Sequence, residues 1–335
     1  TPAFHVRKKG ATTLSYRGTK WLSTAAIIGF VGLFGGATVG GEPQQGAVTD
    51  HVIVVSIDGL RPDAVEKFGM KNLQRLMREG SATLKAQTIL PSKTLPSHTS
   101  MVTGVGPEVH GITWNEARTD ETGVVGVPTI FELAKAQGYQ TAAFFAKSKF
   151  HTLERPNSLD HFQAPNGWQS LLVTRTVEDV ANYLAHAKPN LLFVHIGEAD
   201  FVGHAAGWMS RPYGWAVKMA DAAVGEIIKA ADDAFGRGNY TLIVTADHGG
   251  HGKDHGSADP RDTMIPWIAW GKGVAAGTDA GSVHTTDTAA TVLWLLGVNV
   301  PATWSGEPVT GAFATAARLA TGDTAAAGIP ATATP

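Results

Sequence analysis

Short apolar segments rich in β-branched residues alternate with helical segments through the middle of the chain, and this alternation constrains the fold more than any other feature. We expect strands at 51–57, 140–146, 190–196 and 240–245, with a further candidate at 267–270, and helices at 128–137, 176–187 and 213–235. Continuous apolar strands separated by helices are typical of a mostly parallel sheet with helices on both faces. The sequence therefore predicts an α/β fold, and such folds bind ligands beyond the carboxyl ends of their strands.

The two ends of the chain differ from this middle region. Basic residues at 7–20 precede the uncharged stretch 21–41, which resembles an export signal or a membrane anchor. The stretch is long enough to span a bilayer of about 30 Å, so a cleaved signal and a retained anchor both stay open. We expect a basic N-terminal segment with this signal or anchor at 1–49, a folded domain at 50–310, and a flexible tail rich in Ala and Thr at 311–335. The folded domain is expected to be exported, as a periplasmic or extracellular protein or on an external membrane anchor.

Composition excludes several kinds of site. With 27 basic and 29 acidic residues, the chain offers no net positive charge for a nucleic-acid duplex. Because it contains 0 Cys, disulfides, thiolate metal sites and cysteine nucleophiles are excluded. Any metal site must use His and carboxylate ligands. The sequence carries no signal of oligomeric state.

Acidic residues and histidines follow three of the expected strands. Asp58 ends the first, Asp200 and His204 follow another, and Asp247 and His248 end a third. Asp200 and His204 are four residues apart, so both lie on one face of a helical turn, which suits chelation of one cation. Each pair alone is weak evidence, but three acidic strand ends in one sheet predict a metal site. A further ligand is expected from 251, 255 or 284, which are all His.

The Pro-bounded segment 91–98 carries hydroxyl groups between these strands. Thr94 or Ser97 suits a helix N-cap with no chemical role. A hydroxyl at a helix N-terminus beside a divalent cation also suits a nucleophile. The spacing alone leaves both interpretations open.

Several motifs together resemble the alkaline phosphatase superfamily, and within it the type I phosphodiesterase/nucleotide pyrophosphatase family. These motifs are S-I-D-G-L-R-P-D at 56–63, P-S-K-T-L-P-S-H at 91–98, D-F-V-G-H at 200–204, T-A-D-H-G at 245–249, and H-G at 255–256 followed by Met264. The resemblance covers about residues 50–300 in the family's order. It implies an alkaline-phosphatase-like catalytic core in the folded domain.

The resemblance also implies two divalent metal ions, with Zn²⁺ expected, and a small phosphate-ester substrate. One ion would be held by Asp58, Thr94, Asp247 and His248, and the other by Asp200, His204 and His255. His255 is preferred to His251 because Met264 follows it at the family's spacing. Thr94 would attack phosphorus to form a phosphothreonine, while Asn115 would hydrogen-bond a phosphoryl oxygen. The absence of Cys, together with His98 where sulfatases have Arg, argues against a sulfatase.

Two features depart from the family's pattern. Only six residues, 249–254, separate the Asp-His pair from His255, where relatives usually carry a long insertion. Lys147 and Lys149 resemble a basic pair in superfamily members that hydrolyse phosphomonoesters or phosphonoacetate, where it meets the second negative charge of a dianion. We therefore expect a phosphodiesterase, with a phosphomonoesterase or phosphonoacetate-type hydrolase as the alternative. A membrane-anchored phosphotransferase and a non-catalytic relative are further alternatives, although the retained Thr94 and the complete ligand set argue against the latter.

Overall fold

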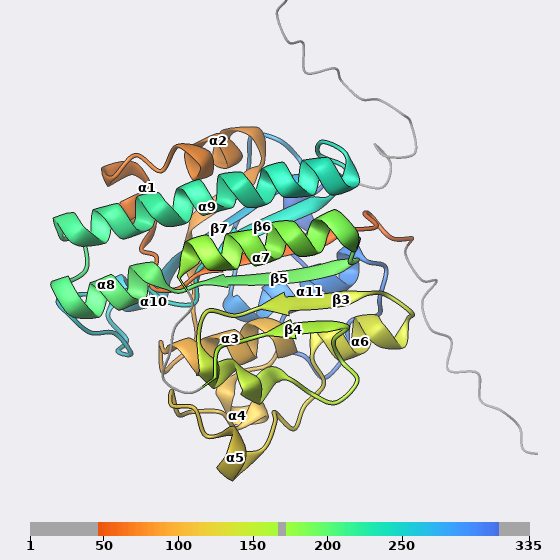
Figure 1. The fold of residues 1–335 in the computed structure, drawn as a ribbon, viewed down its shortest axis with the longest axis horizontal. Coiled ribbons are helices and arrows are strands. Elements are labelled where there is room, and N and C mark those ends of the chain that lie inside the picture. The colour runs from red at the N-terminus through yellow and green to blue at the C-terminus, as the bar shows by residue number, and fades with distance from the viewer. Residues whose placement is uncertain (1–45, 167–171, 315–335) are drawn as a thin grey trace, which may run out of the picture. The chain divides into compact units, whose positions relative to one another are not determined.

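The computed structural model describes residues 46–166 and 172–314, and these form a mixed eight-stranded sheet (Figure 1). The strand order is β4-β3-β5-β1-β6-β7-β2-β8. Their bounds are β1 Val52–Ile57, β2 Ser81–Gln87, β3 Thr141–Phe144, β4 His161–Gln163, β5 Leu191–Ile196, β6 Thr241–Thr245, β7 Met264–Gly271 and β8 Thr278–Asp279. The five strands from β4 to β6 are mutually parallel, and β7 is antiparallel to both of its neighbours. The parallel strands therefore present their carboxyl ends at one edge of the sheet.

Helices cover both faces of this sheet. The longer helices are α2 Lys71–Glu79, α3 Thr94–Thr103, α6 Ile130–Ala136, α7 Val173–His186, α8 Glu198–Ala206, α9 Arg211–Phe235 and α11 Thr285–Leu295. The shorter ones are α1 Pro62–Lys67, α4 Pro107–His110, α5 Thr119–Thr122, α10 Pro260–Thr263, and the 3-10 helices η1 Ser148–Leu153 and η2 Thr310–Ala312. The helices α2, α7, α8 and α9 pack together over one face, while α3, α6 and α11 lie over the other (Figure 1).

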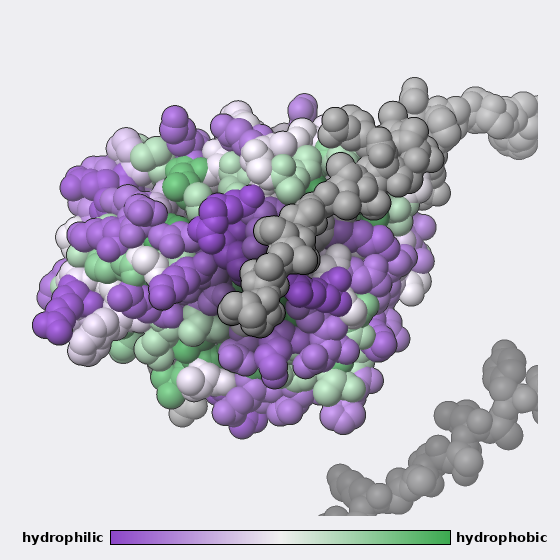
Figure 2. Space-filling view, turned by 90° about the horizontal axis from the view of Figure 1, so that it is seen from above, coloured by the Kyte–Doolittle hydropathy of each residue, from purple (hydrophilic) through white to green (hydrophobic). Residues whose placement is uncertain are grey.

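Burial explains why the central strands form where they do. Every residue of β1, β5 and β6 is buried, as expected for parallel strands that are covered on both faces. The long helix α9 is amphipathic instead: Val217, Val224 and Ile228 lie on its buried face. From above, Figure 2 shows a surface on which hydrophilic residues predominate between smaller hydrophobic areas. The apolar part of the sequence is thus used mainly for the interior of the sheet and its helical layers.

The predicted α/β fold with a mostly parallel sheet is confirmed, and the strands expected from apolar runs are present. Three strands were not predicted. The sequence of β2 mixes buried and half-buried residues, so it lacks a continuous apolar run, while β4 and β8 are very short edge strands. The candidate strand at 267–270 is real, but it runs antiparallel to its neighbours and begins at Met264.

The packed domain extends slightly beyond the predicted boundaries of 50–310. The backbone N–H of Val48 donates to the carbonyl of Leu295, and Thr49 is buried. At the other end Ala312 and Phe313 are buried, and Phe313 pairs with Val274, so the tail predicted from residue 311 begins with packed residues. The predicted signal or anchor at 21–41 and the remainder of the tail lie outside the described residues. Within the described ranges, no helix is both long and apolar enough to cross a membrane.

Candidate metal and phosphoryl-transfer site

Four adjacent parallel strands deliver charged side chains to one place. Asp58 follows β1, Asp247 follows β6, Lys147 follows β3, and Asp200 lies in α8 just after β5. Gly59 allows the close approach of two of these segments: its φ is 71°, and a Cβ there would lie 3.0 Å from the Cα of Asp200. A side chain at position 59 would therefore push apart the two segments that carry Asp58 and Asp200.

Asp200, His204 and His255 form the first group that could hold a metal ion. The Nε2 atoms of His204 and His255 lie 3.3 Å and 3.5 Å from Oδ1 of Asp200. The structure therefore brings together the three residues that the sequence analysis assigned to one metal.

Asp58, Asp200 and His248 form a second such group. Nε2 of His248 lies 3.4 Å from Oδ1 of Asp58 and 3.2 Å from Oδ2 of Asp247. Oδ1 of Asp247 is already occupied, because it accepts the N–H groups of Gly59 and His248 at 3.0 Å and 2.9 Å. Asp58, Asp247 and His248 of the other predicted set thus lie together, while Asp200 belongs to both groups that could hold a metal.

Backbone contacts fix which nitrogen of each histidine is available. The Nδ1 atoms of the three rings lie 2.8–2.9 Å from backbone carbonyl oxygens, namely those of Lys253 for His204, Gly249 for His248 and Ser92 for His255. A carbonyl only accepts, so Nδ1 carries the proton in each ring and Nε2 keeps its lone pair. Burial, together with the nearby His255, lowers the pKa of His248 to about 3, so that imidazole is neutral at neutral pH.

Each of the three site aspartates has one buried oxygen without a hydrogen-bond partner among the described residues: Asp58 Oδ1, Asp200 Oδ1 and Asp247 Oδ2. A buried carboxylate oxygen without a partner is destabilising. All three lie beside an Nε2 lone pair of a histidine, and a divalent cation would satisfy both kinds of group. The residues present therefore fit a metal centre built from carboxylates and histidines.

The carboxylates differ in their electrostatic surroundings. Burial alone would raise the pKa of Asp58, but the ammonium of Lys147 and the hydrogen bond from His195 hold that pKa well below its usual range. The pKa of Asp247 is raised well above its usual value by burial and by the negative charge of Asp58. Without a bound cation, Asp247 is thus the carboxylate that most readily keeps a proton.

Thr94 lies at the first turn of α3, directly beside these ligands. Its side chain is buried, and Oγ1 lies 3.3 Å from Nε2 of His248. The next N–H along the helix, that of Leu95, donates to Oδ1 of Asn115 at 2.9 Å. This contact orients Asn115 next to Thr94, and the amide Nδ2 of Asn115 has no partner among the described residues. Sequence reasoning had placed both residues here.

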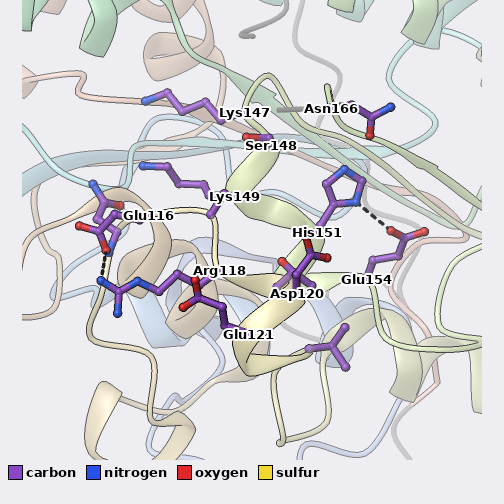
Figure 3. A pocket seen from close by; sticks show the side chains of 14 residues that line it. Glu116, Arg118, Asp120, Glu121, Lys147, Ser148, Lys149, His151, Glu154 and Asn166 are labelled. Atoms are coloured by element: carbon purple, nitrogen blue, oxygen red, sulfur yellow. Dashed lines mark hydrogen bonds and ion pairs between the residues drawn. The ribbon is translucent and has the colours of Figure 1, made fainter. Parts of the chain in front are cut away.

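The two predicted substrate-binding lysines have different environments. Nζ of Lys147 lies 2.6 Å from Oδ2 of Asp58 and 2.5 Å from Oδ2 of Asp200. No described residue forms an ion pair or hydrogen bond with Nζ of Lys149. Lys147 and Lys149 both line a cavity of about 810 Å³, together with Asn115 and with charged residues from α5 and η1 (Figure 3). Both lysines extend toward the same side of that view.

His251, the rejected alternative ligand, has another partner. Its Nδ1 lies 2.7 Å from Oδ1 of the buried Asp262, and it belongs to neither group that could hold a metal. Two further residues lie around the site, and sequence reasoning gave the first of them, His195, no role. His195, inside β5, contacts Asp58, while the indole N–H of Trp208 donates to the carbonyl of Gly59 as its ring packs against His204 and His255. A lone histidine in an otherwise apolar strand was the signal for the first of these.

The mostly parallel α/β sheet, the family match and the structural neighbours described below fit the alkaline phosphatase superfamily. The model of the type I phosphodiesterase/nucleotide pyrophosphatase family matches residues 52–264, and the chain belongs to that family.

Curated relatives are distant and longer. The chain is 24% identical to human GPI ethanolamine phosphate transferase 1, over 67% of this chain and 26% of that protein. It is 25% identical to bis(5'-adenosyl)-triphosphatase enpp4 of Xenopus laevis, over 62% of this chain and 49% of the relative. It is 26% identical to ectonucleotide pyrophosphatase/phosphodiesterase family member 7 of Rattus norvegicus, over 64% of this chain and 53% of that protein. The matched region thus spans about a quarter to a half of each relative.

Solved structures share the fold. Murine ectonucleotide pyrophosphatase/phosphodiesterase 5, in complex with AMP, superposes with a TM-score of 0.68 at 17% identity, covering 79% of this chain and 100% of that one. A 2-O GAG sulfatase superposes with a TM-score of 0.65 at 16% identity, covering 79% of this chain and 74% of that one. At these identities the likeness establishes the fold alone.

Proposed function

We propose that this protein is a metal-dependent hydrolase of phosphoric esters that acts through a phosphothreonine at Thr94. The observation that carries the proposal is the position of the Thr94 hydroxyl. It is buried at the start of α3 and lies 3.3 Å from Nε2 of His248, beside carboxylates with buried oxygens that no described residue hydrogen-bonds. A helix N-terminus also favours negative charge at this point.

Two divalent cations, with zinc as the expected metal, would be held by the predicted ligands. Asp200, His204 and His255 would bind one, and Asp58, Asp247, His248 and the Thr94 oxygen the other. Bound cations would supply the positive charge that lowers the pKa of a coordinated hydroxyl and stabilises phosphoryl oxygens. Carboxylate and imidazole ligands also suit manganese, so the test includes both metals.

The chain's own residues supply the rest of the chemistry. Thr94 Oγ1 releases its proton to solvent and attacks phosphorus, the bond from phosphorus to the leaving oxygen breaks, that oxygen takes up a proton from solvent where it needs one, and a phosphothreonine forms. Water then attacks the same phosphorus, which restores the Thr94 hydroxyl and releases the phosphate product. Asn115, fixed through its Oδ1, directs its free Nδ2 donor at a phosphoryl oxygen, where charge grows in the transition state.

A phosphodiester is the leading substrate class, because the chain belongs to the type I phosphodiesterase/nucleotide pyrophosphatase family. The test compares hydrolysis of p-nitrophenyl phosphate, bis-p-nitrophenyl phosphate and p-nitrophenyl thymidine monophosphate by the zinc- or manganese-loaded protein. Preference for the two diesters supports the proposal. Absence of turnover on all three substrates with either metal would contradict it and favour a non-catalytic relative.

Lys149 favours a phosphomonoesterase or a phosphonoacetate-type hydrolase as the second candidate. No described carboxylate forms an ion pair with its ammonium, and it lines the same cavity as Asn115. A cation there suits the second negative charge of a monoester or phosphonate, which a diester lacks. A strong preference for p-nitrophenyl phosphate would select this candidate, with phosphonoacetate as the next substrate.

The similarity to GPI ethanolamine phosphate transferases keeps a membrane-anchored phosphotransferase as a third candidate. Hydrolysis and transfer share the phosphothreonine and differ only in the acceptor. Product analysis in the presence of added alcohols separates them, because a transferase yields the new ester. Export, with 21–41 as signal or anchor, is likewise proposed, and fractionation of cells that express the full chain tests it.

A further inference from the structure

Lys147 contacts one of the two carboxylate oxygens in each of two predicted metal ligands. Its Nζ contacts Oδ2 of Asp58 at 2.6 Å and Oδ2 of Asp200 at 2.5 Å. In both residues the other oxygen, Oδ1, lies beside a histidine Nε2 and has no hydrogen-bond partner in the described ranges. One lysine thus takes one oxygen from each carboxylate and leaves the second for another cation.

The charge balance of this region depends on that lysine. Asp58, Asp200 and Asp247 are all buried, and like charges this close destabilise one another. Lys147 forms ion pairs with two of them, with only 13% of its own side chain exposed. These two contacts, at 2.6 Å and 2.5 Å, place the ammonium of Lys147 inside the carboxylate cluster.

The fold places Lys147 firmly. It directly follows Ala146, whose N–H donates to Nδ1 of His195 at 3.2 Å, and the same ring contacts Asp58 through Nε2 at 2.9 Å. The strand before it, β3, pairs with β5, which leads into Asp200. Lys147 thus comes from an element that is tied to both carboxylates that it bridges.

We propose that Lys147 is an internal counter-cation that holds Asp58 and Asp200 together between the two metal groups, so that the site is assembled before metal arrives. The proposal deepens the proposed function and rests on it for the identity of the metal ligands. It assigns Lys147 a positioning role toward the ligands and leaves contact with a substrate dianion to Lys149.

The consequence is measurable without catalysis. In the metal-free protein, Lys147→Met leaves two buried carboxylates without their cation. Breaking a buried ion pair in this way is strongly destabilising, and we expect the Tm in the presence of chelator to fall by about 10 °C. Added zinc then replaces the missing charge, so the rise in Tm between chelated and zinc-loaded protein is larger for this variant than for the wild type.

Lys149→Met is the matched control. It removes the same kind of ammonium two residues away, where no carboxylate of the described residues forms an ion pair with it. We expect its metal-free Tm and its zinc-dependent rise to stay close to those of the wild type. Equal Tm values for Lys147→Met and Lys149→Met in chelator would overturn the proposal and favour a substrate-binding role for Lys147.

Two further measurements keep the test decisive. If Lys147→Met does not fold without metal, the double variant Lys147→Met/Asp200→Asn removes the excess negative charge. It should recover a folding transition in chelator, and failure to do so overturns the counter-cation role. The proposed function would be contradicted if the wild type hydrolysed no phosphoric ester and its Tm did not respond to zinc or manganese. The comparison of the lysine variants in chelator would still decide this inference.

Discussion

His195 and Asp58 form a buried hydrogen bond of 2.9 Å between Nε2 and Oδ2, and this contact defines the tautomer of His195. Nδ1 of the same ring accepts the N–H of Ala146, so the proton is on Nε2 and is donated to the carboxylate. Burial also keeps the pKa of His195 below its usual value. A neutral imidazole therefore orients Asp58 without adding charge to the site.

Replacing His195 should weaken metal binding. His195→Phe removes the donor to Asp58 but keeps a ring among the aromatic neighbours Phe150 and His98. Loss of such an outer hydrogen bond typically weakens metal affinity about 10–100-fold, and we expect an effect of that size by titration calorimetry. His195→Gln, which can still donate to Asp58, should retain most of the affinity. Equal affinities for the two variants would exclude an orienting role.

We expect Thr94 to be essential for turnover, whereas metal binding by the other ligands should not depend on it. Thr94→Ala removes the nucleophile, and we expect kcat to fall by about 10³-fold or more. The metal groups keep all their carboxylates and histidines, so metal content by elemental analysis should stay close to that of the wild type. Thr94→Ser keeps a hydroxyl and should form a phosphoserine that is detectable by mass spectrometry after acid quench. Substantial activity in Thr94→Ala would rule out the phosphothreonine pathway.

The choice between two neighbouring histidines is a direct test of the metal site. His255→Ala should lose about one metal equivalent per chain, because its Nε2 faces Oδ1 of Asp200. His251→Ala is the matched control, since Nδ1 of His251 is held by Asp262. We expect that control to keep its full metal content. The reverse pattern of metal loss would make His251 the ligand.

The sequence predicted the parallel centre of the fold and the residues of the site more completely than their contacts. Asp58, Asp200 and Asp247 were recognisable because each follows a strand, and the carboxyl ends of parallel strands meet at one edge. The hydrogen bond between His195 and Asp58 joins residues 137 positions apart, so no local spacing reports it. Likewise, the pattern of Lys147 and Lys149 indicates a basic pair, but only the side-chain contacts show that Lys147 pairs with two carboxylates and that no described carboxylate forms an ion pair with Lys149.

Lys149 gives the site a pH dependence that should distinguish its substrates. Burial and the nearby charge of Lys147 lower the pKa of Lys149 to about 8, from a usual value of 10.5. Its ammonium is thus present below that pH and is lost as the pH rises through it. A phosphomonoester is a dianion across this range, because its second pKa is about 6, whereas a diester carries one negative charge.

We therefore expect the ratio of kcat/KM for p-nitrophenyl phosphate to kcat/KM for bis-p-nitrophenyl phosphate to fall as the pH rises from 7 to 9.5. The ratio cancels effects that the two substrates share, such as ionisation of metal-bound groups. Lys149→Met should lower the ratio at pH 7 by about tenfold and make it nearly independent of pH, because the titrating cation is gone. If the variant keeps the wild-type profile, another group recognises the second charge. If the wild-type ratio does not change with pH, Lys149 does not contact the phosphoryl group.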